Sequence, residues 1–384
     1  MSWKHMDATG EFLIKIEDFP ELLNTLLKEK IVDKIISAET KVDKKTNLED
    51  RFTVVPKLME KAEDTAIFPL TNLIAYGYAR TDSASKYLHK SVQGAMKEKV
   101  GLIARPCDTR ALIELAKIKQ INLDNLFIIA IEDRGLLPKA GRDIKKIKDI
   151  DPAKIIKEKV GDKGLIVKLD DGSSKELDLT VAENCLRCYR KLPIIADLSV
   201  SDLGIPIDSN EIILKVYSEN GNTVLEKSGI SKKPLPNDIK KTHTQKYEDI
   251  IAQAREKRVK DLEEWAKVPQ EEKLERLKKC TACGMCIRGC PVCYCVDCIL
   301  MNKKKEKTID NISYQLTRIA HDADRCVECG NCDNNCPMNL PLSLYFQSLN
   351  DAFKEKFKYE SGHSVDDIPF RSGKAIAKME LEKT

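Results

Sequence analysis

Two short cysteine runs near the C-terminus carry the clearest chemistry in this chain. Each reads C-x2-C-x2-C-x3-C-P, and we call them ladder 1 and ladder 2. Ladder 1 consists of Cys280, Cys283, Cys286, Cys290 and Pro291, and ladder 2 of Cys326, Cys329, Cys332, Cys336 and Pro337. This spacing is typical of a loop that wraps a 4Fe-4S cluster. We therefore predict two 4Fe-4S clusters in the C-terminal part of the chain.

The fourth cysteine of each ladder predicts an exchange of ligands between the two loops. In two-cluster ferredoxins the cysteine before the proline binds the cluster of the other loop. The expected ligands are Cys280, Cys283, Cys286 and Cys336 for cluster 1, and Cys326, Cys329, Cys332 and Cys290 for cluster 2. Structural zinc sites are the alternative, but zinc ribbons use two C-x-x-C pairs and need no fourth cysteine followed by proline. The pattern therefore predicts a chain that moves single electrons.

Three cysteines outside the ladders are candidates for a third 4Fe-4S cluster. Cys107 follows the apolar stretch VGLIARP and begins a predicted helix, where the helix dipole favours a thiolate. Cys185 and Cys188 form a C-x-x-C pair farther along the chain. A fourth ligand would come from the tract PVCYCVDC, which contains Cys293, Cys295 and Cys298. Other interpretations stay open: Cys107 can be a small buried apolar residue, the C-x-x-C pair can bind nothing or be a redox pair, and the tract can flank the clusters without binding iron.

Length and composition limit the class of protein. With 384 residues the chain is long enough for two or three domain cores. Charged residues make up 33%, yet the formal net charge is only +4, so nothing predicts a nucleic-acid partner. The chain opens without a signal-peptide core, and no apolar stretch reaches the roughly 20 residues that span a bilayer. Eight of the fourteen cysteines have ferredoxin-type spacing, which then predicts the reducing cytoplasm.

Apolar periodicity predicts a parallel α/β sheet in the N-terminal part. Strand candidates at residues 100–106 and 126–133 flank a helical stretch, and this order forms a right-handed parallel unit. Further candidates are a helix at 19–30, a strand within 31–40, a strand at 65–70 and a helix at 90–97. An α+β section follows, in which residues 211–229 are interpreted as a hairpin that turns at Glu219 to Asn222. A long helix within 247–279, interrupted near Pro269, leads to ladder 1.

Two stretches in the middle of the chain resemble a known family. They are YLHKSVQGAMKEKVGLIARPCDTRALIEL and ENCLRCYRKLPIIADLSVSDLG, and the resemblance spans roughly residues 15–205. The family is the beta subunit of coenzyme F420-reducing hydrogenases and of related formate dehydrogenases. In that family a strand ends in Pro-Cys before a helix, and a Cys-x-x-Cys segment leads into an Ala-Asp-hydrophobic-Ser segment. The matching residues here are Pro106, Cys107, Cys185, Cys188, Ala196, Asp197, Leu198 and Ser199.

The resemblance implies an iron-sulfur flavoprotein subunit, in which FAD exchanges a hydride with coenzyme F420 or a similar two-electron carrier. Flavin suits this task because it is stable in one-electron and two-electron states. The resemblance also implies partner subunits of the formate dehydrogenase, hydrogenase or heterodisulfide reductase type. By the family's arrangement, Lys86 and Ser91 are candidate contacts to the cofactor. Arg105, Thr109 and Arg110 are candidates to clamp a pyrophosphate or to steer the anionic carrier. A solvent-facing side chain is the alternative for each of the five.

The predicted fold class is an α/β N-terminal flavoprotein-like lobe with an α+β section, followed by a helical two-cluster ferredoxin-like C-terminal domain. The expected segments are a flavin and hydride-carrier domain at 1–235, a helical linker at 236–279, a ferredoxin-like domain at 280–345, and a helical and polar tail at 346–384. The rival function is a flavin-free ferredoxin-type electron-transfer adaptor. It is favoured because the chain lacks the glycine-rich N-terminal segment of the family. The absence of a G-x-G-x-x-G motif argues against classical NAD binding. A subunit with its own organic substrate has no support, since five scattered histidines form no evident acid-base site.

Overall fold

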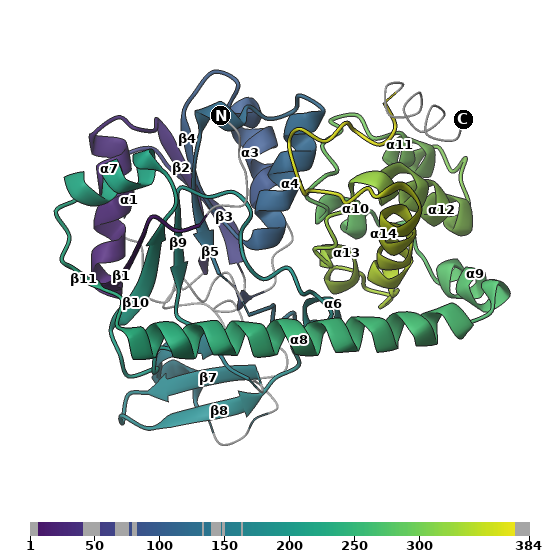
Figure 1. Ribbon diagram of the computed structural model, residues 1–384. Helices are drawn as coiled ribbons and strands as arrows, with labels where there is room; N and C mark the ends of the chain where they lie inside the picture. The colour runs from purple at the N-terminus through teal and green to yellow at the C-terminus, as the bar shows by residue number, and fades with distance from the viewer. Residues whose placement is uncertain are drawn as a thin grey trace.

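An eight-stranded mixed sheet forms the N-terminal part of the molecule. The computed structural model describes residues 7–40, 54–65, 77–78, 83–132, 134–139, 147, 150–162 and 164–372. The strands of the sheet, in chain order, are β1 (Gly10–Lys15), β2 (Lys34–Thr40), β3 (Val54–Met59), β4 (Val100–Ala104), β5 (Leu126–Ile131), β9 (Leu198–Ser201), β10 (Glu211–Val216) and β11 (Lys232–Pro234). Their order in space is β11-β1-β10-β9-β5-β4-β2-β3 (Figure 1). The neighbouring pairs β2–β4, β4–β5 and β5–β9 are parallel, which confirms the predicted parallel sheet, and antiparallel strands extend it on both sides.

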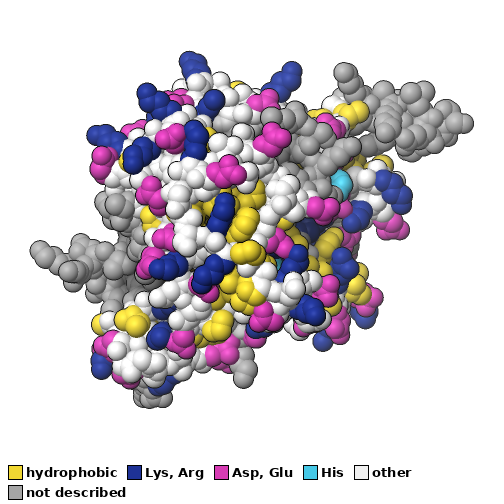
Figure 2. All heavy atoms as spheres, turned by 60° about the vertical axis from the view of Figure 1, so that its left-hand side comes forward, with side chains coloured by type: hydrophobic (Ala, Val, Ile, Leu, Met, Phe, Trp, Pro, Cys, Tyr) yellow, Lys and Arg dark blue, Asp and Glu magenta, His cyan; other side chains and the backbone are white. Residues whose placement is uncertain are grey.

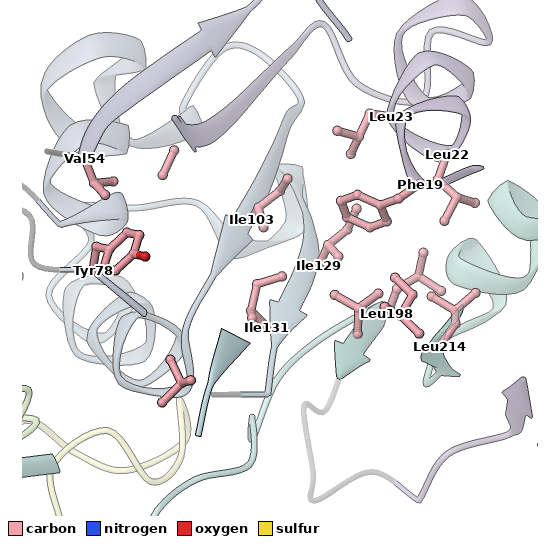
Figure 3. Close-up of a cluster of buried hydrophobic side chains, with 14 of the residues drawn as sticks. Phe19, Leu22, Leu23, Val54, Tyr78, Ile103, Ile129, Ile131, Leu198 and Leu214 are labelled. Carbon is pink, nitrogen blue, oxygen red and sulfur yellow. The ribbon is translucent and has the colours of Figure 1, made fainter. Parts of the chain in front are cut away.

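Helices cover both faces of this sheet, because its central strands are apolar on both sides. The helices are α1 (Phe19–Lys28) and α7 (Glu219–Lys227) on one face, and α3 (Ala84–Val92) and α4 (Pro106–Lys117) on the other (Figure 1). Ile103 and Ile129 belong to the core under α1, whereas Leu102 and Ile128 belong to the core under α3 and α4. Successive residues of a strand point to opposite faces, so each strand contributes to both cores. Figure 3 shows the first core, where Phe19 of α1 lies near Ile129.

A 31-residue helix, α8 (Asn237–Lys267), crosses from the N-terminal sheet to the C-terminal helices (Figure 1). At 1.5 Å per residue it is about 46 Å long. It is followed by α9 (Gln270–Lys278), and Pro269 separates the two helices as predicted. A small antiparallel sheet of β6 (Ile155–Val160), β7 (Gly164–Leu169) and β8 (Ser174–Asp178) lies on the other side of α8. The C-terminal part is helical, which confirms the coarse prediction of a mixed α/β part followed by a helical part. Its helices are α10 (Met285–Arg288), α11 (Ile299–Lys305), α12 (Asn311–Asp322), α13 (Asn331–Asn334) and α14 (Leu342–Phe357).

Two local predictions were wrong. Residues 211–229 are not a hairpin but strand β10 followed by helix α7, because the Ser218 side chain accepts a hydrogen bond from the Gly221 backbone N–H at 3.0 Å and caps the helix. The helix expected at 90–97 was placed too late in the chain, because α3 spans Ala84–Val92. After Val92 the chain turns through Gly94, which has a left-handed conformation with φ +68°. For the strand expected at 65–70, Thr65 ends the short helix α2 (Ala62–Thr65), and the other residues lie outside the described ones.

Charges of both signs are interspersed on the surface, as the composition indicates. Figure 2 shows basic and acidic side chains alternating over the visible face, with apolar side chains between them. Among the described helices, none is both long enough and apolar enough to cross a membrane.

Buried charges fasten ladder 2 to α8 and to the N-terminal part. Arg258 of α8 donates two hydrogen bonds to the Glu328 carboxylate, at 2.8 and 3.0 Å. Although burial opposes ionisation of Glu328, the charge of Arg258 lowers its pKa to about 2. Asn184 belongs to the short helix α6 (Glu183–Leu186). Its side-chain amide donates a hydrogen bond to the Glu328 backbone carbonyl at 2.9 Å. Arg187 extends the contact, with hydrogen bonds to Gln347 at 2.9 Å and to Ser343 at 3.0 Å.

We expect Arg258→Met to destabilise the folded protein by about 3 kcal/mol, because removing one partner leaves a buried charge uncompensated. The measurement is urea unfolding of anaerobic protein followed by circular dichroism. Arg255→Met is the matched control: Arg255 is exposed on the same helix and, like Arg258, lies over the Tyr189 ring. Adding Glu328→Gln to Arg258→Met should recover part of the loss. Equal stability of the Arg258 and Arg255 variants would contradict the role of the pair.

Candidate metal centres

Both ladders fold into the same local structure, in which a left-handed glycine starts a single helical turn. Gly284 has φ +80° and caps α10, and Gly330 has φ +71° and caps α13. Residues with a side chain rarely adopt this conformation, and a Cβ on Gly330 would also lie 2.4 Å from the side chain of Asn184. The third cysteine of each ladder, Cys286 or Cys332, therefore lies in the first turn of its helix.

Cysteines of both ladders meet at one buried cavity. Its walls include Cys290 of ladder 1 together with Cys326, Cys329 and Cys332 of ladder 2. These are the four residues expected to bind cluster 2, and that binding stays a prediction. Burial raises the pKa of the three ladder 2 thiols well above its ordinary value. Four thiols around one cavity fit a cationic iron centre, which would let them ionise.

The thiols expected for cluster 1 receive hydrogen bonds from neutral donors. The Gln315 side-chain amide donates to Cys280 Sγ at 3.1 Å and to Cys286 Sγ at 3.8 Å. The Ala282 backbone N–H donates to Cys280 Sγ at 3.2 Å. Cys336 of ladder 2 packs into the same apolar cluster as Cys280 and Cys286, whereas Cys283 is exposed. Donors of this kind favour a charged sulfur ligand over a neutral thiol.

The other cysteines lie around ladder 2 or at the surface. Cys107 lies in the first turn of α4. Burial, and to a lesser extent the charge of Cys107, raise the pKa of Cys329. Cys293 donates to the Asp322 carboxylate at 3.2 Å, and both have ligand atoms within 4.8 Å of Cys290. The other four cysteines have different surroundings. The Cys188 thiol donates a hydrogen bond to the Arg190 carbonyl at 3.7 Å, and Cys185 lies beside Gly135. Cys295 is exposed, and Cys298 is the residue before the first turn of α11. The third cluster therefore stays a prediction.

The residues predicted to contact a flavin are bonded within the chain or exposed. Lys86 Nζ donates to the Ile287 carbonyl at 2.8 Å, and Arg110 Nη2 donates to the Val327 carbonyl at 2.6 Å. The hydroxyl of Thr109 donates to the Pro106 carbonyl at 2.8 Å, and Arg105 is buried 3.6 Å from the Asp108 carboxylate. Ser91 is exposed on α3. Lys86 and Arg110 join the N-terminal part to the ladders, so a pyrophosphate would have to replace these bonds to use them.

Three polar residues on one face of α12 were missed by the sequence analysis. Gln315, Arg318 and Asp322 are all buried, and Arg318 and Asp322 line the cavity of ladder 2. A signal was available, because the three recur at helical spacing among the apolar residues of a segment between the ladders. Polar residues on the apolar face of a helix beside cysteine loops indicate partners for a metal centre.

Comparison with protein families agrees with both halves of this description. A family model for the C-terminal part of the beta subunit of coenzyme F420 hydrogenase/dehydrogenase matches residues 97–233. A model of a 4Fe-4S dicluster domain matches residues 279–341 and so contains both ladders.

Curated relatives match most of the chain. The F420-dependent formate dehydrogenase subunit beta of Methanocaldococcus jannaschii is 28% identical over 362 residues, which cover 89% of this chain and 90% of the relative. The F420-dependent formate dehydrogenase 1 subunit beta of Methanococcus maripaludis is 30% identical over 295 residues, covering 70% and 74%. A chain of the F420-reducing [NiFe] hydrogenase complex from Methanosarcina barkeri aligns in structure with a TM-score of 0.48 and 15% identity, covering 68% of this chain and 93% of that chain. The predicted resemblance is confirmed: the chain belongs to the coenzyme F420 hydrogenase/dehydrogenase beta subunit family and is an oxidoreductase subunit with a 4Fe-4S dicluster region.

Proposed function

We propose that this chain is the electron-transfer subunit of an F420-dependent formate dehydrogenase or a related hydrogenase, and that its ladders hold two 4Fe-4S clusters. The cavity walled by Cys290, Cys326, Cys329 and Cys332 is the observation that carries the proposal. It supports binding of cluster 2 by three cysteines of one ladder and the fourth cysteine of the other. Cluster 1 would be held by Cys280, Cys283, Cys286 and Cys336.

The carrier and the partners are inferred from the relatives. Both curated relatives are described as beta subunits of F420-dependent formate dehydrogenases, which favours formate dehydrogenase over hydrogenase or heterodisulfide reductase as the partner enzyme. The small carrier would be coenzyme F420 or a similar hydride carrier. FAD would supply the conversion between a hydride and single electrons. A third cluster would be held by Cys107, Cys185 and Cys188. Cys107 belongs to α4, the helix whose Arg110 is hydrogen-bonded to the Val327 carbonyl of ladder 2.

The chain's own residues would tune the clusters by burial and hydrogen bonding. The amides of Gln315 and Ala282 donate to Cys280, and the Leu340 backbone N–H donates to Cys336 Sγ at 3.4 Å. Such donors stabilise the more negative, reduced form of a cluster. Apolar neighbours such as Leu342 and Phe346 would exclude water from the same region.

A flavin-free electron-transfer adaptor is the second candidate function. It is favoured by the contacts of Lys86, Thr109 and Arg110, whose polar groups are bonded to carbonyls of the chain itself. In this function the N-terminal part would serve to dock the ladders and a partner, and electrons would enter from another subunit.

Cluster content tests the proposed ligands. Cys329→Ala should lower the iron content by about four atoms per chain, because it removes one wall of the cavity of ladder 2. Cys295→Ala is the comparison variant, because this exposed cysteine is not among the ligands proposed for clusters 1 and 2, and it should keep the roughly eight irons of these two clusters. The measurement is iron and acid-labile sulfide on anaerobically purified protein. Full iron in the Cys329 variant, or fewer than about eight irons in the Cys295 variant, would sink the ligand sets proposed for clusters 1 and 2.

Flavin content separates the two functions. The wild-type protein from the same preparation should contain about one FAD per chain and about eight irons, or about twelve if the third cluster is present. Iron and sulfide without flavin would instead identify the adaptor. Cys107→Ala tests the third cluster in the same assay, because it should remove about four irons only from a protein that holds twelve.

A further inference from the structure

A second thiol, that of Cys293, lies beside Cys290 at the edge of the ladder 2 cavity. The Sγ atoms of both cysteines and a carboxylate oxygen of Asp322 all lie within 4.8 Å of one another. Cys290 and Asp322 line the cavity, whereas Cys293 is not part of its wall. Ladder 2 has no such pair, because Asn339 stands three residues after Cys336. Ladder 1 thus brings two thiols to a place where the proposed cluster 2 needs one.

A tight turn fixes the position of Cys293. Its backbone N–H donates to the Cys290 carbonyl at 3.3 Å, so the backbone of Cys290 is needed to place Cys293. The side chain packs with Cys290 and Cys329 in a small apolar cluster that also contains Ala111 of α4. The Sγ donates a hydrogen bond to Asp322, the last residue of α12, at 3.2 Å. Turn, packing and hydrogen bond together hold this thiol next to Cys290 without placing it in the cavity wall.

The two thiols are alternatives for one ligand position of cluster 2. A 4Fe-4S cluster takes four cysteine thiolates, and ladder 2 supplies three of them. Two cysteines separated by two residues can present both sulfurs to one metal site, as C-x-x-C pairs do in structural zinc sites. Because only Cys290 of the two lines the cavity, it takes the position in the intact protein. If its sulfur is removed, a rotation of the Cys293 side chain can bring the second sulfur into the space, since the two sulfurs lie within 4.8 Å.

We propose that Cys293 is a reserve ligand of cluster 2, which binds iron in place of Cys290 when the Cys290 sulfur is absent. The inference rests on the proposed function, in which Cys290 is the fourth ligand of this cluster. In the exchange Cys293 gives its thiol proton to Asp322, which already accepts its hydrogen bond. Its sulfur then forms the iron bond that Cys290 no longer makes, and no electron is transferred.

Iron and acid-labile sulfide in anaerobically purified variants test this proposal, with circular dichroism as the check on folding. Cys290→Ala and Cys293→Ala should each keep the iron content of the wild type, because one thiol remains for the position. The double variant Cys290→Ala/Cys293→Ala should lose about four irons per chain. Cys290→Ala/Cys295→Ala is the matched control, since Cys295 is an exposed cysteine of the same tract, and it should contain as much iron as Cys295→Ala alone.

Three results would overturn the reserve role. The first is a folded Cys290→Ala protein that loses about four irons, because Cys293 then does not replace Cys290. The second is the same loss in Cys293→Ala alone, because Cys293 would then be a ligand of the intact protein. The third is full iron in the double variant, because neither thiol would then bind cluster 2.

A variant of nearly the same size decides the matter if Cys290→Ala does not fold. Cys290→Ser should keep its iron, and Cys290→Ser/Cys293→Ala should lose about four irons. Loss of iron in Cys290→Ser, or full iron in this second double variant, would also overturn the reserve role. A wild-type protein with fewer than about eight irons would instead reject the proposed function itself, so the two failures are distinguished by the iron count of the wild type.

Discussion

The ion pair between Arg258 and Glu328 is the contact on which the arrangement of the site depends. Glu328 stands between two cysteines of ladder 2, and Arg258 belongs to the helix that spans the molecule. Because the pair is buried, neither charge can exchange its partner for water without a large cost. Asn184 fixes the backbone of the same loop from the N-terminal part. The loop that carries three of the cavity's four cysteines is thus held from two directions by groups that are far away in sequence.

Neutral and charged polar groups have different tasks around the ladders. Backbone N–H groups and the Gln315 amide point at individual sulfurs, where they orient a ligand and withdraw charge from it. Arg318 and the pair of Arg258 with Glu328 act at longer range, since Coulomb interactions in a buried site are weakly screened. In the proposed function, the same fold would combine a fixed ligand geometry with cluster potentials that are tuned by a few side chains on α8 and α12.

The sequence predicted those features that depend on local patterns. Strands β4 and β5 and the helix α4 between them follow from short apolar runs and their spacing, and the ladders follow from a fixed cysteine pattern. Residues 211–229 were predicted wrongly because Asn and Gly favour both turns and helix ends, and the capping bond of Ser218 decides between them. The role of Arg258 could not be predicted, since an exposed and a buried arginine look alike until α8 is packed against ladder 2. The strand order beyond the parallel centre is also set by long-range pairing, as between β1 and β10.

Because Cys290 of ladder 1 lines the ladder 2 cavity, the ladder 2 site cannot be separated from ladder 1 as an independent segment. A segment that begins after Pro291 would contain all of ladder 2 and still lack one wall of its cavity, and Glu328 would have lost Arg258. The smallest segment that contains the whole site is therefore longer than the two ladders together, because it must also include the part of α8 that carries Arg258. Transplanting this centre into another scaffold would mean moving the helix with the loops, and in evolution the two would be expected to change together.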